Sequence, residues 1–234
     1  NRADVLIDGG AELEVGWLPA LLESARNGKL AAGAPGRISA SRGVTLLQVP
    51  VPSDRSGGDV HALGNPHFLI DPVNVRLIVG HIADQLALVD PANAELYKAN
   101  LKKFDVTLDG KLADWQRQLA PYRGAKIVTY HEDFVYLAER FNLVIVETLE
   151  PKPGIAPSPA HLTRVIDKMK AENARLILVQ PFQNRKTAET VARQTDGIVL
   201  DIPQQPGALP NTATYCDLMD YIVHTLATAF AEKK

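Results

Sequence analysis

The stretch that decides the fold is AKIVTYHEDFVYLAERFNLVIVE, residues 125–147. Residues 125–130 form an apolar run of the length of a buried strand, and residues 133–141 carry apolar side chains at the three- and four-residue spacing of a helix. A second apolar run at residues 143–147 predicts another strand. A strand, a helix and a strand in this order indicate parallel strands joined by a covering helix, as in α/β folds.

The same alternation continues to the C-terminus. Helices are predicted at residues 158–173, 187–194 and 214–232, and strands at residues 176–179 and 198–200. Strands that alternate with helices of this length imply a parallel sheet covered on both faces. Residues 122–234 are therefore expected to form a C-terminal α/β lobe.

The region upstream is also predicted to be α/β. Strands are predicted at residues 5–8 and 44–49, a helix at residues 17–25 and a loop over residues 27–43. Asp71 is a good N-cap and Pro72 a good first helical residue, so a second helix is predicted from there to about residue 88. Residues 1–92 are expected to be the remainder of an N-terminal α/β lobe.

Between the two lobes lies the longest periodic stretch of the chain. Its apolar stripe has members three or four residues apart: Leu101, Phe104, Leu108, Leu112, Trp115 and Leu119. At 1.5 Å per residue, a helix from Asn93 to Leu119 would be roughly 40 Å long, which is long for one lobe. We therefore predict two parallel-sheet lobes with flanking helices, joined by one long helix over residues 93–121.

Composition excludes several functional classes. Of the 234 residues 46% are apolar and 22% are charged, and the net charge is −2, with no basic stripe for nucleic acid. The single cysteine, Cys216, rules out an internal disulfide and a cysteine-based zinc site. No apolar run approaches the ~18 residues of a membrane span, and no basic start followed by an apolar stretch marks a signal peptide. Because the chain opens almost at once on a strand pattern, we expect further sequence upstream of Asn1 and an incomplete N-terminal lobe.

Two histidines lie where an extended stretch gives way to a helical pattern, which is where α/β folds bind ligands. His67 follows Asn65 and Pro66 in a tight turn, and His131 follows the strand at residues 125–130. Each has a structural alternative when taken alone: a surface turn for His67, and packing at a strand end for His131. Together they are the best candidates for a metal site built from two segments.

Other polar residues are weaker candidates. Asp201 follows a predicted strand and is either an oxygen ligand or a turn cap, and His61 is either an auxiliary ligand or a solvated histidine in a polar loop. The carboxylates Glu132, Asp133, Glu147 and Glu150 would allow a zinc hydrolase. The sequence nevertheless contains no His-Glu-x-x-His pair, no Gly-x-Ser-x-Gly elbow and no phosphate loop, so an enzyme is not predicted.

A further set of observations comes from blocks of sequence in a fixed order. These blocks are Ala3–Ile7 with Leu13, Glu14, Trp17 and Leu18; Gly64–Pro72; Asp90–Ala94 with Tyr97, Asn100 and Leu101; Tyr130–Phe134 with Tyr136 and Leu137; Glu150–Pro159; and Val179–Phe182. In this order they resemble the zinc- and manganese-type substrate-binding proteins of bacterial ABC transporters. Several blocks in register along nearly the whole chain are more specific than any single histidine.

The resemblance implies two α/β lobes joined by a rigid helix (the class III metal-binding-protein fold), with one metal ion between them. Matching block by block implies His67, His131 and Asp201 as ligands, with His61 as an auxiliary, and leaves a further histidine upstream of Asn1. Gln180 stands where the family often has glutamate and receives no ligand role. Imidazole at His131 implies zinc rather than manganese, because nitrogen donors suit zinc.

The resemblance also implies a function. The chain is expected to capture a divalent metal in the periplasm, or outside the cell on a membrane tether, and to deliver it to an ABC permease. The implied partners are the metal ion and the permease, with only a peripheral relation to the membrane and no nucleic acid. A zinc-dependent hydrolase that uses the same histidines, and a metal-binding surface adhesin, are the alternatives.

Overall fold

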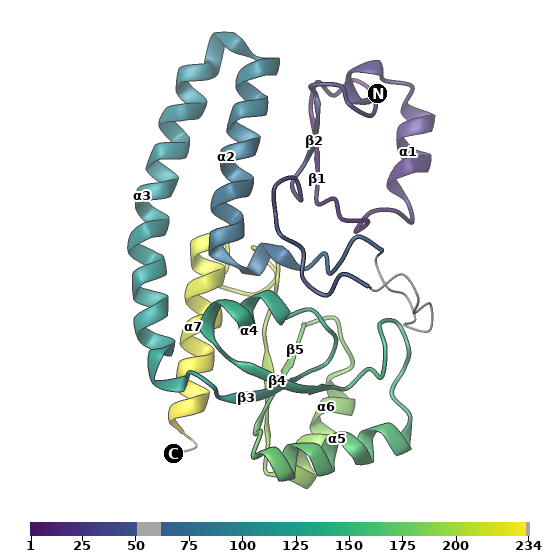
Figure 1. Ribbon diagram of the computed structural model, residues 1–234, viewed down its shortest axis with the longest axis vertical. Coiled ribbons are helices and arrows are strands. Elements are labelled where there is room, and N and C mark those ends of the chain that lie inside the picture. Colours follow the sequence, from purple (N-terminus) through teal and green to yellow (C-terminus); the bar gives the residue numbers. More distant parts are fainter. Residues whose placement is uncertain (51–61, 233–234) are drawn as a thin grey trace. The chain divides into compact units, whose positions relative to one another are not determined.

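The computed structural model describes residues 1–50 and 62–232 (Figure 1). The chain divides into two compact units. Unit 1 contains the described residues up to Gly110, and unit 2 contains those from Lys111 onward. No helix in the described part of the chain is both long and apolar enough to cross a lipid bilayer.

Unit 1 contains a small parallel sheet. Strand β1 (Leu6–Asp8) pairs with β2 (Arg37–Ser39), with Ile7 opposite Ile38. Ile38 is fully buried, and the Arg37 guanidinium forms an ion pair with Asp8 at 2.6 Å between Nε and Oδ2. The helical elements of this unit are α1 (Leu18–Ala25), η1 (Gly28–Leu30), η2 (Phe68–Ile70), α2 (Pro72–Val89), η3 (Pro91–Asn93) and the first part of α3 (Ala94–Leu119).

Two predictions for this unit were wrong. Residues 44–49 do not form a strand, and the strand that pairs with β1 lies at Arg37–Ser39, inside the predicted loop. The backbone of Gln48 has a φ of +50°, which is left-handed and ends any extended run there. The true strand has only three residues, too few to produce a visible alternation of apolar and polar side chains.

The two long helices, α2 and α3, lie close to where the sequence predicted them. The Asp71 carboxylate accepts a hydrogen bond of 2.9 Å from the backbone N–H of Val73, and Pro72 is the first residue of α2, as predicted. Helix α3 has 26 residues and matches the predicted long helix. The boundary between the two units falls inside α3, between Gly110 and Lys111.

Unit 2 contains the larger sheet. Its strands are β3 (Lys126–Thr129), β4 (Val144–Thr148), β5 (Leu176–Val179) and β6 (Ile198–Asp201), all parallel, in the order β4-β3-β5-β6. The helical elements are η4 (Ala120–Tyr122), α4 (Val135–Phe141), α5 (Pro159–Glu172), α6 (Arg185–Thr195) and α7 (Tyr215–Ala231). The predicted parallel α/β architecture is confirmed, including every strand and helix predicted after residue 122.

The core of unit 2 explains this arrangement. All four residues of β5 are buried, as expected for a central strand between two helical layers. Helices α5 and α6 pack against each other and over one face of the sheet (Figure 1). The buried cluster beneath them is Val128, Tyr130, Leu149, Val165, Ile166, Met169, Ala174, Ile177, Val179, Ala188, Val191 and Ala192.

The last part of α3 is fixed to α7 by a polar contact. The indole Nε1 of the fully buried Trp115 donates a 2.8 Å hydrogen bond to Oδ1 of Asp220 on α7. The ammonium of Lys111 forms an ion pair with the other oxygen of the same carboxylate. A buried indole must find an acceptor, so this contact fixes the register of the two helices within unit 2.

Candidate metal centre

One edge of the larger sheet gathers the candidate residues of unit 2. His131 lies two residues beyond the end of β3, Glu150 two residues beyond the end of β4, and Gln180 directly after β5. Asp201 is the last residue of β6. Because all four strands are parallel, these residues emerge at the same carboxyl edge, where open α/β sheets bind their ligands.

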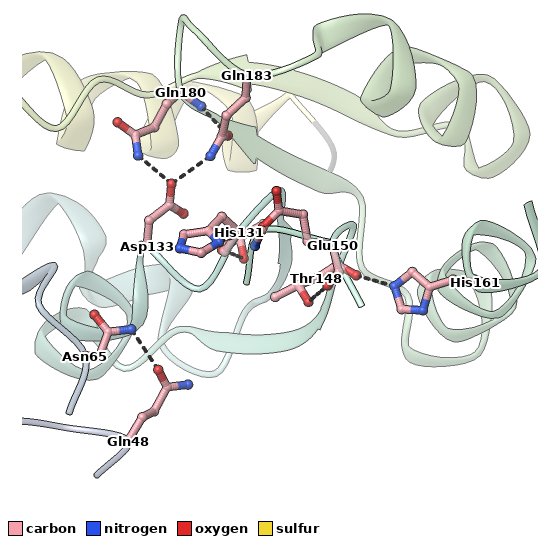
Figure 2. Close-up of polar contacts among 11 residues, drawn as sticks. Gln48, Asn65, His131, Asp133, Thr148, Glu150, His161, Gln180 and Gln183 are labelled. Atoms are coloured by element: carbon pink, nitrogen blue, oxygen red, sulfur yellow. Dashed lines mark hydrogen bonds and ion pairs between the residues drawn. The ribbon is translucent and has the colours of Figure 1, made fainter. Parts of the chain in front are cut away.

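His131 is held by a carboxylate (Figure 2). Its Nδ1 lies 2.7 Å from Oε2 of Glu150, and only about a fifth of either side chain is exposed, 22% and 19%. A carboxylate accepts a hydrogen bond from a ring N–H, so this contact places a proton on Nδ1 and leaves the lone pair of the neutral ring on Nε2. A histidine that ligates a metal usually has such a partner on its other nitrogen.

The backbone of His131 is fixed by the strand before it. Thr129, the last residue of β3, donates a 2.6 Å hydrogen bond from its hydroxyl to the carbonyl of His131. Thr129 is fully buried, so the turn that carries the histidine starts from an anchored residue. The position of the imidazole therefore follows from the end of a rigid strand.

Asp133 makes a separate buried cluster two residues further on. Its Oδ2 accepts hydrogen bonds from the side-chain amides of Gln180, at 2.6 Å, and Gln183, at 3.0 Å (Figure 2). Burial raises the pKa of the Asp133 carboxyl to about 6, against the opposing effects of the Gln180 amide and the nearby His131. The predicted helix at residues 133–141 begins later, at Val135, because Asp133 turns inward to these amides.

Asp201 has partners of its own. Its carboxylate forms an ion pair with Arg185 on α6, and its carbonyl accepts a 3.1 Å hydrogen bond from the hydroxyl of Tyr221 on α7. Because Asp201 is already paired with Arg185, a metal would have to compete with Arg185 for the carboxylate. Strand β5 lies between β3 and β6, so the backbones at the ends of β3 and β6 are on the order of 10 Å apart.

His67 belongs to unit 1, where it precedes η2. Its backbone N–H donates a 2.9 Å hydrogen bond to Oδ1 of Asn65. The buried Asn65 in turn donates from Nδ2 to Oε1 of Gln48 at 2.7 Å and from its backbone N–H to the carbonyl of Leu47 at 2.8 Å (Figure 2). The backbone before His67 is thus fixed by one amide side chain. His61 lies outside the described residues.

Within each unit, the described residues contain no group of three or more His, Cys, Asp or Glu side chains gathered for a metal ion. His131 and Asp201 share an edge of unit 2, and His67 stands in unit 1. Sequence reasoning did not identify the role of Glu150 as the partner of His131. A signal for it exists, because Thr129-x-His131 and Thr148-x-Glu150 repeat the same spacing at the ends of two strands.

Comparison with known proteins places these features in a family. The family model described as zinc-uptake complex component A, periplasmic, matches residues 1–229. The high-affinity zinc uptake system protein ZnuA of Brucella abortus is 27% identical over 129 residues, which are 55% of this chain and 39% of that protein. The manganese ABC transporter substrate-binding lipoprotein PsaA of Streptococcus anginosus is 23% identical over 201 residues, 84% of this chain and 62% of that protein.

A solved structure agrees at the level of the fold. A crystal structure of ZnuA superimposes with a TM-score of 0.77 at 22% identity, covering 97% of this chain and 80% of that one. The chain spans well under two thirds of the length of the Brucella relative. Since the family model covers nearly every residue, the chain belongs to the zinc-uptake complex component A family, the periplasmic metal-binding proteins of metal ABC transporters.

Proposed function

We propose that this chain captures a divalent transition metal outside the cytoplasm and delivers it to an ABC permease. The observation that carries the proposal is the match of the family model from residue 1 to residue 229, which includes both candidate histidines. The geometry of unit 2 supports it, because the His131–Glu150 contact has the form expected of a metal-ligating histidine and its partner. The family is one of non-enzymatic transport proteins, which disfavours the hydrolase alternative.

The proposed ligands are His67, His131 and Asp201, with His61 as an auxiliary. Zinc is the preferred metal, because imidazole nitrogens are donors well suited to it, and manganese is the alternative. Relatives carry names for both: the Brucella protein is named for zinc uptake and the Streptococcus protein for manganese. Delivery to a permease implies a periplasmic or membrane-tethered location with only peripheral contact with the membrane.

The test is metal titration of the whole chain at neutral pH. Zinc and manganese affinities are measured by competition with a chelator, for the parent chain and for His67→Ala, His131→Ala and Asp201→Asn. Each variant is expected to lose more than ~10-fold in zinc affinity, because the loss of a ligand costs at least as much as the loss of a partner of a ligand. The control is His224→Ala, which removes an exposed imidazole from α7 and should leave the affinity unchanged.

Three results would contradict the proposal or its ligands. One is a parent chain that binds neither zinc nor manganese while its circular dichroism shows a folded α/β protein. Another is a set of folded variants that bind as the parent does, which would remove these residues from the site. A loss confined to Asp201→Asn, with both histidine variants unaffected, would also reject the imidazole ligands.

A further inference from the structure

We propose that Glu150 is a positioning residue for metal binding: it fixes His131 in the tautomer whose Nε2 lone pair binds the ion. The inference rests on the proposed function, because it assigns His131 the role of a ligand. It goes further by naming what sets the state of the ring. The carboxylate does not touch the metal in this scheme. It acts through the 2.7 Å contact with Nδ1.

The first support is a pair of matching turns. Thr129 and Thr148 lie opposite each other in the register of β3 and β4. The hydroxyl of Thr129 donates to the carbonyl of His131, and the hydroxyl of Thr148 donates to the carbonyl of Glu150, both at 2.6 Å. Two neighbouring strands therefore end in the same hydrogen-bonded turn. His131 and Glu150, each two residues after its threonine, lie next to each other at the carboxyl edge of the sheet.

The pairing of the backbones continues past the strands. The N–H of Leu149 donates to the carbonyl of Thr129, and the N–H of Glu150 donates to the carbonyl of Tyr130, both at 2.9 Å. These bonds hold the segment that carries the carboxylate directly beside the segment that carries the imidazole. The His131–Glu150 contact is thus supported by main-chain hydrogen bonds between the two segments.

The register itself depends on an irregularity. Ile127 pairs with Ile145, but Val128 pairs with Glu147, so β4 contains one residue more than β3 between these points. Such bulges re-aim side chains at functional edges. If the pairing continued without this shift, Thr129 would lie opposite Glu147, and the two turns would no longer match. The shift therefore aligns Glu150 with His131.

A third contact, from helix α5, holds Thr148 at the start of the turn that carries Glu150. Nε2 of the buried His161 on α5 lies 2.9 Å from the carbonyl of Thr148 (Figure 2). A guanidinium nitrogen of Arg164 lies 3.0 Å from Nδ1 of the same ring. The guanidinium can only donate, so His161 accepts at Nδ1 and donates from Nε2 to the strand end. The Glu150 carboxylate also receives the backbone N–H of Gly154 at 3.4 Å. Glu150 is thus restrained from several sides.

This arrangement has two physical consequences for binding. A ring whose proton is already on Nδ1 need not change tautomer when the ion arrives. The negative charge behind Nδ1 also makes Nε2 a stronger donor, and the loss of such a partner typically costs 10–100-fold in metal affinity. We therefore expect Glu150 to set the affinity of the site although it contributes no ligand atom.

The experiment combines two readouts on the full chain. The first is the ¹⁵N chemical shift of the His131 ring in metal-free protein at pH 8, which reports the nitrogen that carries the proton. The second is zinc affinity by chelator competition. The variants are Glu150→Ala and Glu150→Gln, since the glutamine carbonyl can still accept from Nδ1–H but has no charge. Glu139→Ala, which removes an exposed carboxylate on α4, is the matched control.

In the parent and the control, His131 should be the Nδ1–H tautomer. Glu150→Ala should mix the two tautomers and reduce zinc affinity by ~10–100-fold, and Glu150→Gln should keep the tautomer and recover part of the affinity. A purely structural role would reduce affinity without a change in tautomer. That result, or an Nε2–H tautomer in the parent, would overturn the proposal while the parent still binds zinc. A parent that binds no metal rejects the proposed function instead.

Discussion

At the residue scale, single side chains fix the backbone around the candidate histidines. Asn65 is the best example in unit 1, since its amide bonds to the N–H of His67 on one side and to the side chain of Gln48 on the other. The residue is buried, so the loss of these bonds would leave polar groups without partners away from water. The contribution of Asn65 can therefore be measured as a change in the free energy of unfolding.

We expect Asn65→Ala to lower the free energy of unfolding of unit 1 by roughly 1–3 kcal/mol, the cost of stranding buried polar groups. Asn65→Asp keeps the acceptor for His67 but sets a buried carboxylate oxygen against the acceptor Oε1 of Gln48, so it should be destabilising as well. Urea unfolding of both variants measures the difference. Equal stability of Asn65→Ala and the parent would show that the Asn65 side chain does not hold this turn.

The candidate site could be predicted from the sequence only in part. His131 was found because a histidine directly after an apolar run stands out, and the strand before it is where it was predicted. The contact of Glu150 with His131 could not be predicted from an apolar run, because it depends on a one-residue shift between β3 and β4. Asp133 was named among the candidate carboxylates, but its burial was not predicted, because its amide partners, Gln180 and Gln183, lie 47 and 50 residues further along the chain.

At the element scale, the start of α7 shows how a capping motif responds to pH. Thr214 and Asp217 form a reciprocal capping box, in which the Asp217 carboxylate accepts a 3.0 Å hydrogen bond from the N–H of Thr214. The hydroxyl of Thr214 donates to the same carboxylate at 2.7 Å. These hydrogen bonds hold the pKa of Asp217 below its ordinary value, because they favour the ionised carboxylate.

A lowered pKa in the folded state means that Asp217 stabilises the fold above its ordinary pKa of about 3.9 and that this stabilisation is lost as the pH falls through the folded value. We therefore expect Asp217→Asn to be less stable than the parent at pH 7. The difference in unfolding free energy should shrink as the pH approaches 3. Asp167→Asn, an exposed change on α5, is the control. A pH-independent difference would mean that the carboxylate charge is not the cause.

Short elements were the least predictable from sequence. Strand β5 was found correctly because four buried apolar residues stand between two helices. Strand β2 was missed because its three residues include one apolar side chain, and its pairing depends on the distant Asp8–Arg37 ion pair and on β1. Local pattern therefore predicts the elements that form a core, and it fails where a long-range partner decides.

At the scale of the whole molecule, the chain is two units that meet within one helix. Unit 2 holds the four-stranded sheet, its helices and a continuous buried cluster. A body with its own core and a closed set of strand pairings meets the requirements for independent folding. Unit 1 has only a two-stranded sheet in its described part. The two units should therefore differ in how well they fold alone.

We expect a fragment of residues 111–234 to unfold in a single cooperative thermal transition. A shorter fragment of residues 124–234 lacks Lys111 and Trp115, which both contact Asp220, and should melt at a lower temperature. Circular dichroism in the near and far ultraviolet follows both. A fragment of residues 111–234 without fixed tertiary structure would show that unit 2 needs the rest of the chain.

The helix shared by the two units has a consequence for how the molecule comes apart. Order spreads easily along a helix once it has begun, so melting that starts in one unit tends to run along α3 into the other. Gly110 stands at the boundary, and glycine is the residue that gains most freedom on leaving a helix. Unfolding of the helix can therefore end at Gly110. The more stable unit can then keep its own turns of α3 after the other unit has unfolded.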